Sequence, residues 1–96
     1  MPDDDPSLFK IGDIIVRRWA KKTPGKIVGV RYDPEERQVT YMVVTAGKRF
    51  GEWKGHPLWH FLDPVEIAGQ FRRQAAYYNG RAAELEERIE KTRGVV

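Results

Sequence analysis

The stretch that decides the fold is FKIGDIIVRRWAKKTPGKIVGVRY, residues 9–32. Two turn signals, Gly12-Asp13 and Pro24-Gly25, each precede a short run rich in Ile and Val. Gly and Pro favour turns because of their special backbone angles, and β-branched runs between turns are typical of strands. The stretch therefore predicts strands over residues 13–19 and 26–32, joined by a basic loop that contains a proline.

Three more short strands are predicted downstream. The polar turn at residues 33–37 leads into an alternating run at 38–45, whose two fairly apolar faces are typical of a central strand. A shorter strand that contains a glycine follows at 48–53, and residues 58–62 form a fifth short strand or a single helical turn. Five short strands separated by turn residues predict a small barrel over residues 9–62.

The C-terminal third predicts a helix. The sequence Asp63-Pro64-Val65-Glu66 combines an N-cap, a proline at the first helical position and a capping-box glutamate. Apolar residues then recur at spacings of four and three, at Phe71, Ala75, Tyr78, Ala82, Leu85 and Ile89. Asn79-Gly80 is a weak point, because both residues are poor helix formers, but the apolar seam keeps its phase across it. We expect one continuous amphipathic helix from Pro64 to about Thr92.

The first half of the chain resembles SH3-like small barrels of the KOW/Tudor type. It is also similar to the type II plasmid dihydrofolate reductases, which are tiny SH3-like barrels that assemble as tetramers around a central pore. The residues that carry this resemblance are Phe9, Gly12-Asp13, Arg17-Arg18, Gly25–Gly29, Pro34-Glu35 and Tyr41–Val43. The reductases line their pore with Val-Gln-Ile-Tyr, where this chain has Leu58-Trp59-His60-Phe61. The resemblance therefore implies the fold and not the activity.

The predicted fold class is α+β, with a five-stranded SH3-like small barrel followed by one long C-terminal amphipathic helix. Residues 1–8 are expected to be a flexible acidic tail, and residues 63–96 a helix that packs on the barrel and extends beyond it. Such a helix would be roughly 40 Å long, which exceeds what the barrel can cover. The apolar positions that the barrel cannot cover predict self-association or a partner helix, as in a coiled coil. The alternative is a helix that folds back on its own barrel. The predicted interface residues are Phe71, Tyr78, Ala82, Leu85 and Ile89.

Composition excludes several classes of protein. The 96 residues suffice for one domain, and the absence of cysteine excludes disulfides and thiolate metal sites. No apolar run approaches the length of about 18 residues that spans a bilayer, and the acidic N-terminus is unlike a secretory signal. We expect a soluble, cytoplasmic protein without a cofactor. His56 and His60 are separated by Pro57, which opposes the helix that would bring them together, so no metal site is expected.

The charge distribution points to a polyanionic partner. The net charge is +3, and residues 9–62 carry eleven Lys and Arg against five Asp and Glu. The densest basic cluster is RRWAKKTPG, residues 17–25, in which basic side chains suited to phosphates flank an indole suited to stacking on a base. We predict a non-enzymatic module that contacts nucleic acid or a nucleoprotein complex. The predicted contacts are Arg17, Arg18, Trp19, Lys21, Lys22, Lys48, Arg49, Trp53 and Lys54.

Three alternatives remain open from the sequence. The first is an assembly protein that uses the helical seam, with Tyr41, Trp53 and Trp59 gripping a peptide. The second is a remote one, an enzyme of the reductase type, although no catalytic residues are predicted. The third is a cage for methylated lysine or arginine, built from Trp19 and Tyr32 together with Tyr41 and Trp53.

Overall fold

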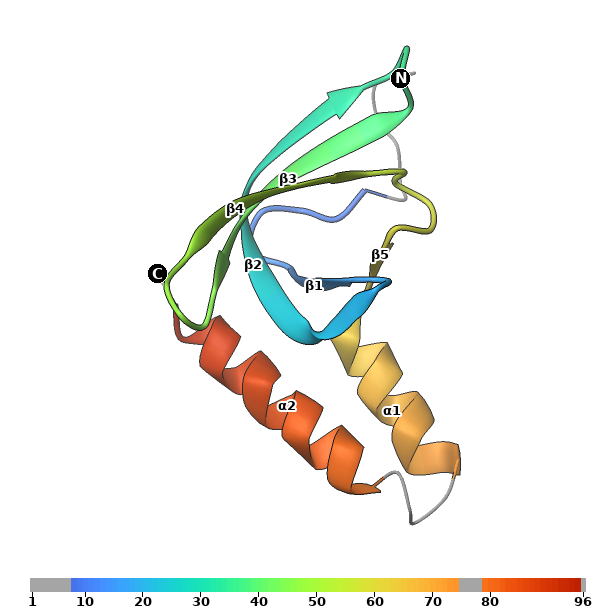
Figure 1. Ribbon diagram of the computed structural model, residues 1–96, viewed down its shortest axis with the longest axis vertical. Coiled ribbons are helices and arrows are strands. Elements are labelled where there is room, and N and C mark those ends of the chain that lie inside the picture. The colour runs from blue at the N-terminus through green and yellow to red at the C-terminus, as the bar shows by residue number, and fades with distance from the viewer. Residues whose placement is uncertain (1–7, 75–78, 96) are drawn as a thin grey trace.

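A computed structural model describes residues 8–74 and 79–95 of the chain. Its elements, in chain order, are β1 (Ile14–Arg17), β2 (Ala20–Asp33), β3 (Gln38–Thr45), β4 (Phe50–Gly55), β5 (Phe61–Leu62), α1 (Pro64–Gln74) and α2 (Asn79–Arg93). The strands form one twisted sheet, and the two helices lie together beneath its β1 end (Figure 1). Within the described ranges, neither helix has the length and apolar character needed to cross a membrane.

The five strands form an antiparallel sheet in the order β4-β3-β2-β1-β5. The chain runs as a meander from β1 to β4, and β5 then returns to pair with β1. The five predicted strands are therefore confirmed. The described part of the sheet is open, with β4 and β5 at its two edges, so the expected closed barrel is not formed by this pairing.

Strand β2 is twice as long as the sequence predicts. It begins at Ala20, and its first part pairs with β1 while its second part pairs with β3. The basic segment that we expected to be a loop is therefore mostly strand. Arg17 pairs with Ala20 and Ile15 pairs with Gly25, so the register of β1 against β2 shifts between these two pairs. Pro24 lies in this irregular part of β2. A proline is tolerated there because the ladder is interrupted and its missing N–H is not required.

Two apolar clusters hold the fold together. The first lies against the sheet and is centred on Tyr41, which is fully buried. Its other buried members are Ile15, Ile27, Val39, Val43, Trp53 and Phe61. The hydroxyl of Tyr41 accepts the backbone N–H of Phe9 at 3.0 Å, and this bond ties the segment before β1 to the core. Because side chains alternate along a strand, Val16 points the other way from Ile15 and enters the second cluster.

The expectation of one long helix is wrong, because the structure has two helices. Helices α1 and α2 lie side by side and run in opposite directions (Figure 1). Asn79 and Gly80 are the first residues of α2, where poor helix formers cost little because the first N–H groups have no helical partner in any case. Residues 75–78, which include Ala75 and Tyr78 of the predicted seam, lie outside the described residues.

Burial of the apolar seam explains the two-helix arrangement. Leu85 and Ile89 of α2 pack against Ile67 and Ala68 of α1 and against Val16 of β1. A continuous rod would leave these side chains in water, and each buried Leu or Ile contributes roughly 1.5–3 kcal/mol. The end of α2 is held by Lys26 of β2, whose Nζ donates to the carbonyls of Arg93 (3.4 Å) and Val95 (3.3 Å).

Candidate functional site

Four rings meet where the β1–β2 turn approaches the segment between β4 and β5. We call this group the aromatic cluster, and its members are Trp19, His56, Trp59 and His60. The ring centroids of Trp59 and His60 are 4.5 Å apart, and those of Trp19 and His60 are 5.5 Å apart. His56 completes the group at 5.1 Å from Trp59. His60 is therefore the centre on which the two indoles converge.

The backbone around the cluster fixes both imidazoles. Nδ1 of His60 accepts the backbone N–H of His56 at 2.5 Å, and Nδ1 of His56 accepts the backbone N–H of Leu58 at 3.2 Å. An imidazole that accepts at Nδ1 carries its proton on Nε2 when it is neutral. Both rings are thus oriented by the segment that contains them.

Arg18 joins the two parts of the cluster. Its backbone N–H donates to the carbonyl of His60 at 2.9 Å, which extends the β1–β5 pairing by one residue. Its guanidinium Nη1 donates to the carbonyl of Trp59 at 3.4 Å. Gly55 makes room from the other side, because a Cβ at that position would lie only 2.5 Å from Nδ1 of His60. The cluster is therefore built on paired backbone and a close glycine contact.

The two indoles of the cluster are open to solvent. Trp19 is 62% exposed and Trp59 is 51% exposed, and the neighbouring Leu58 is 66% exposed. Exposed apolar groups that occur together mark interaction surfaces. The arrangement can offer stacking faces next to the cation of Arg18.

The predicted contact residues do not all gather at this place. Arg18 and Trp19 belong to it, and Lys21 and Lys22 follow on β2, where they line a pocket against the helices. Lys48 and Arg49 are exposed in the turn between β3 and β4. That turn lies on the opposite side of the molecule from the β1–β2 turn (Figure 1).

Three further predicted residues have other surroundings. Trp53 is only 7% exposed and belongs to the sheet core, and the guanidinium of Arg17 lies over its ring. Lys54 is exposed on β4 and lines a hollow with Arg31 and Tyr32. Tyr41 and Trp53 are core side chains, whereas Trp19 is exposed on the cluster, so the four aromatic residues considered for a methyl-lysine cage are not gathered in one place.

The predicted interface residues of the helix face the chain itself. Ala82 is fully buried, Leu85 and Ile89 are buried in the second cluster, and Phe71 is partly buried against it. Tyr78 lies outside the described residues. Helix α2, which we considered as a dimer interface, therefore packs on β1 and α1 of its own chain.

Sequence reasoning missed His56, Trp59 and His60 as members of one site. Their membership depends on β5 pairing with β1, which brings together residues about forty positions apart. The available signal was the density of rings in HPLWHF, residues 56–61, beside a glycine at position 55 that has space for a neighbouring ring. No set of three or more His, Cys, Asp or Glu side chains placed to hold a metal occurs in the described part of the chain.

Comparisons with protein-family models, with curated proteins and with solved structures found no match to this chain.

Proposed function

We propose that this protein is a non-enzymatic binding module that holds single-stranded nucleic acid, or such a strand within a nucleoprotein complex, on the aromatic cluster. The observation that carries the proposal is the convergence of two exposed indoles, Trp19 and Trp59, on the ring of His60 beside Arg18. Unpaired bases stack on aromatic faces whatever their identity, whereas bases in a duplex are already stacked on one another. A single strand is therefore the partner that this surface suits best.

Nearby cations supply the phosphate contacts that stacking lacks. Lys21 and Lys22 are exposed on the strand that begins directly after Trp19. The Arg18 side chain is also exposed, and its Nη1 donates to the carbonyl of Trp59. Other N–H groups of the guanidinium can donate to an oxygen acceptor such as a phosphate. With about three phosphates neutralised on a single strand, log affinity should fall with log salt at a slope of about −2.

The order of the strands explains how the cluster forms. We propose that the sheet is an SH3-like small barrel in its strand plan, because it is a five-stranded antiparallel meander whose last strand returns beside the first. That return places the β4–β5 segment against the β1–β2 turn and so creates the cluster. Folds of this kind serve many functions, so the argument for nucleic acid comes from the side chains and not from the fold.

A binding titration tests the proposal. Fluorescence anisotropy of a dye-labelled twelve-nucleotide strand of mixed sequence should show binding by the full chain. Trp19→Ala and Trp59→Ala should each weaken it roughly 5- to 150-fold, because a base–aromatic stack contributes about 1–3 kcal/mol. Phe50→Ala is the matched control, since Phe50 is 76% exposed on β4, the far edge of the sheet, and lies outside the cluster.

Two results would count against the proposal. One is the absence of binding at low salt, and the other is an equal loss of affinity in Phe50→Ala and Trp59→Ala. A duplex of the same sequence provides the second control, and it should bind more weakly than the single strand because its bases are not free to stack.

The alternative proposal is a protein partner on the helical seam. It would require α2 to leave β1, because Ala82, Leu85 and Ile89 are already buried within the chain. Exposing two such large side chains costs about 3–6 kcal/mol, which a partner would have to offset. The structure therefore favours the aromatic cluster over the seam as the place of recognition.

A further inference from the structure

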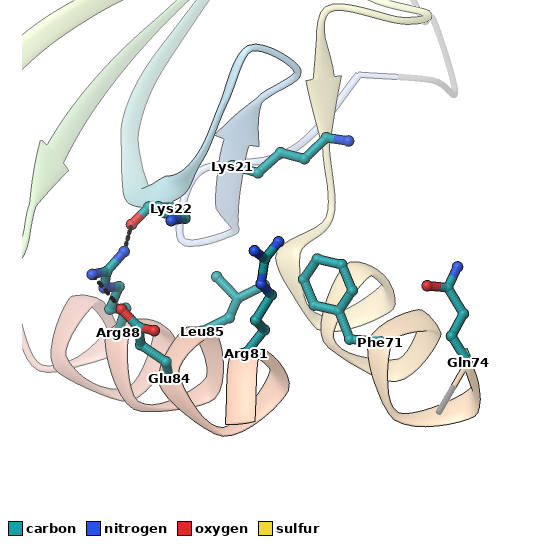
Figure 2. A pocket seen from close by; sticks show the side chains of 8 residues that line it. All are labelled: Lys21, Lys22, Phe71, Gln74, Arg81, Glu84, Leu85 and Arg88. Atoms are coloured by element: carbon teal, nitrogen blue, oxygen red, sulfur yellow. Dashed lines mark hydrogen bonds and ion pairs between the residues drawn. The ribbon is translucent and has the colours of Figure 1, made fainter. Parts of the chain in front are cut away.

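Different parts of the sheet have different cover. Helix α2 packs against β1 and β2, where Nη1 of Arg88 donates to the carbonyl of Lys22 at 2.9 Å (Figure 2). Strand β4 is one edge of the sheet, and in the described part of the chain no strand lies beyond it. An open edge presents unpaired N–H and C=O groups, which can pair with a further strand. The edge of β4 is therefore a surface that a partner strand could cover.

The hydrogen bonds of the β3–β4 hairpin show which residues face this edge. The backbone N–H of Thr45 donates to the carbonyl of Arg49 at 3.1 Å, so these two opposed residues form a hydrogen-bonded pair. Such pairs alternate along an antiparallel ladder, and the register of β3 against β4 continues without a shift to the end of β4. Every second residue of β4 therefore turns its N–H and C=O toward β3. The residues between them, Phe50, Glu52 and Lys54, turn theirs toward the open edge.

Two opposite charges lie on this edge. Glu52 and Lys54 are exposed, whereas Trp53 between them belongs to the core. Side chains alternate along a strand, so those of Glu52 and Lys54 share the outer face of the sheet. Glu52 lies 3.9 Å from Arg31 in an ion pair that is weak because both side chains are exposed. Lys54 has no ion-pair partner among the described residues, so both charges can pair with a strand that arrives at the edge.

A second copy of the chain fits this edge in one register. Two β4 strands that pair antiparallel are related by a two-fold axis. With the axis at Trp53, Glu52 of each copy lies directly opposite Lys54 of the other, which gives two favourable cross-strand pairs. An axis at Glu52 or at Lys54 would place like charges opposite each other. An axis between two residues would set outward N–H groups against groups that are already bonded to β3.

We propose that β4 pairs antiparallel with β4 of a second copy of this chain, about a two-fold axis at Trp53, and so joins the two sheets into one. The charges that stabilise this register repel a copy that arrives in a neighbouring register, so they select one alignment of the two strands. This dimer interface is independent of the proposed nucleic-acid site, because Glu52 and Lys54 lie outside the aromatic cluster.

Sedimentation velocity of the full chain over a wide range of concentrations tests the dimer. The parent should pass from monomer to dimer as its concentration rises. Glu52→Lys and Lys54→Glu should each weaken the dimer about fivefold or more, because each places like charges opposite one another twice. The double swap of Glu52→Lys with Lys54→Glu should restore the dimer, since opposite charges face each other again. Glu36→Lys, which makes the same change of charge in the exposed β2–β3 turn, is the matched control.

Amide hydrogen exchange in the parent gives a second readout that needs no variant. The N–H groups of Glu52 and Lys54 should exchange more slowly as the protein concentration rises, because they become hydrogen-bonded across the axis. The N–H of Trp53, which faces β3, should change little over the same range.

Several results would overturn the dimer. They are a monomer at every concentration, a double swap that dimerises as weakly as the single variants, and an equal loss in Glu36→Lys. A dimer whose Glu52 and Lys54 amides keep the exchange rates of the monomer would be built on another surface, such as the helices, and would overturn the pairing of β4 as well.

Discussion

The guanidinium carbon of Arg17 lies 4.4 Å from the ring centroid of Trp53. The two residues, which we predicted as exposed contacts to nucleic acid, therefore form a stacked pair of cation and indole. Trp53 is 7% exposed, and Nε of Arg17 is buried with no hydrogen-bond partner in the described residues. A cation over an indole face gains about 0.5–2 kcal/mol, while an unpaired buried N–H costs about 1–3 kcal/mol. The two terms nearly cancel, so Arg17 covers the core without stabilising it strongly.

Replacing Arg17 with methionine tests this balance. Arg17→Met keeps a long apolar stem over Trp53 and removes both the charge and the buried N–H. The free energy of unfolding from urea denaturation should change by less than about 1 kcal/mol, whereas Trp53→Ala should lower it by about 3–5 kcal/mol. A loss of several kcal/mol in Arg17→Met would show that the cation itself stabilises the core.

Gly55 is predicted to be indispensable to the aromatic cluster. In Gly55→Ala the new Cβ would lie 2.5 Å from Nδ1 and 2.8 Å from Cβ of His60, so the ring must move. Urea denaturation should show a loss of about 1–3 kcal/mol, typical of overpacking, and fluorescence should report a changed environment for Trp19 and Trp59. Gly47→Ala is the matched control: its Cβ would have no neighbour closer than 3.9 Å, and its stability should stay level or rise slightly. Similar losses in the two variants would contradict this account.

Leu85 distinguishes a cover from a dimer seam. Leu85→Lys places a charge between α1, α2 and β1, so the monomer itself should be destabilised by several kcal/mol. Thermal denaturation should show the same loss at every protein concentration. If the seam joined two copies instead, the variant would dissociate and its melting temperature would lose a dependence on concentration that the parent shows.

Lys26 is predicted to secure the last turn of α2. Lys26→Met retains the aliphatic stem and removes the two donor bonds to the carbonyls of Arg93 and Val95. Unfolding free energy should fall by about 0.5–1.5 kcal/mol, because cations near a helix C-terminus satisfy its last carbonyls. Amide exchange should speed up in residues 88–93 and stay unchanged in β3, and Lys48→Met serves as the control. Uniform acceleration across both regions would mean that the effect is global and not a lost cap.

Local chemistry was enough to predict the number of strands and several turns. The turn at residues 33–37 follows from Asp33, whose Oδ1 accepts the backbone N–H groups of Glu35 and Glu36, as an Asx turn requires. The start of α1 follows from Asp63, whose Oδ1 accepts the N–H of Val65. Both signals act over two or three residues, and a single sequence contains all the information they need.

The remaining features depend on contacts between distant residues. The extension of β2 through Pro24 requires a partner strand to impose its register, and the division of the helix requires α1 and β1 as surfaces on which to bury Leu85. Trp53 alternates with Gly51 and Gly55 on β4, and a Cβ at Gly25 would meet its ring at 2.7 Å. Glycines on both sides of an indole leave space for neighbouring chain to pack against its ring. That pattern was therefore a usable sign that Trp53 belongs to the core.

The aromatic cluster depends on the pairing of β5, the shortest strand of the sheet. Strand β5 has two residues and lies at an edge, and segments of that kind open locally at a fraction of the global unfolding free energy. Only when Phe61 and Leu62 are paired with β1 does His60 meet Trp19. A nucleic-acid strand bound across the two indoles would therefore stabilise the paired form of β5. At a hundred times its dissociation constant, a ligand that binds only this form stabilises it by about 2.7 kcal/mol. Binding of the nucleic acid and pairing of β5 with β1 are therefore coupled in one equilibrium.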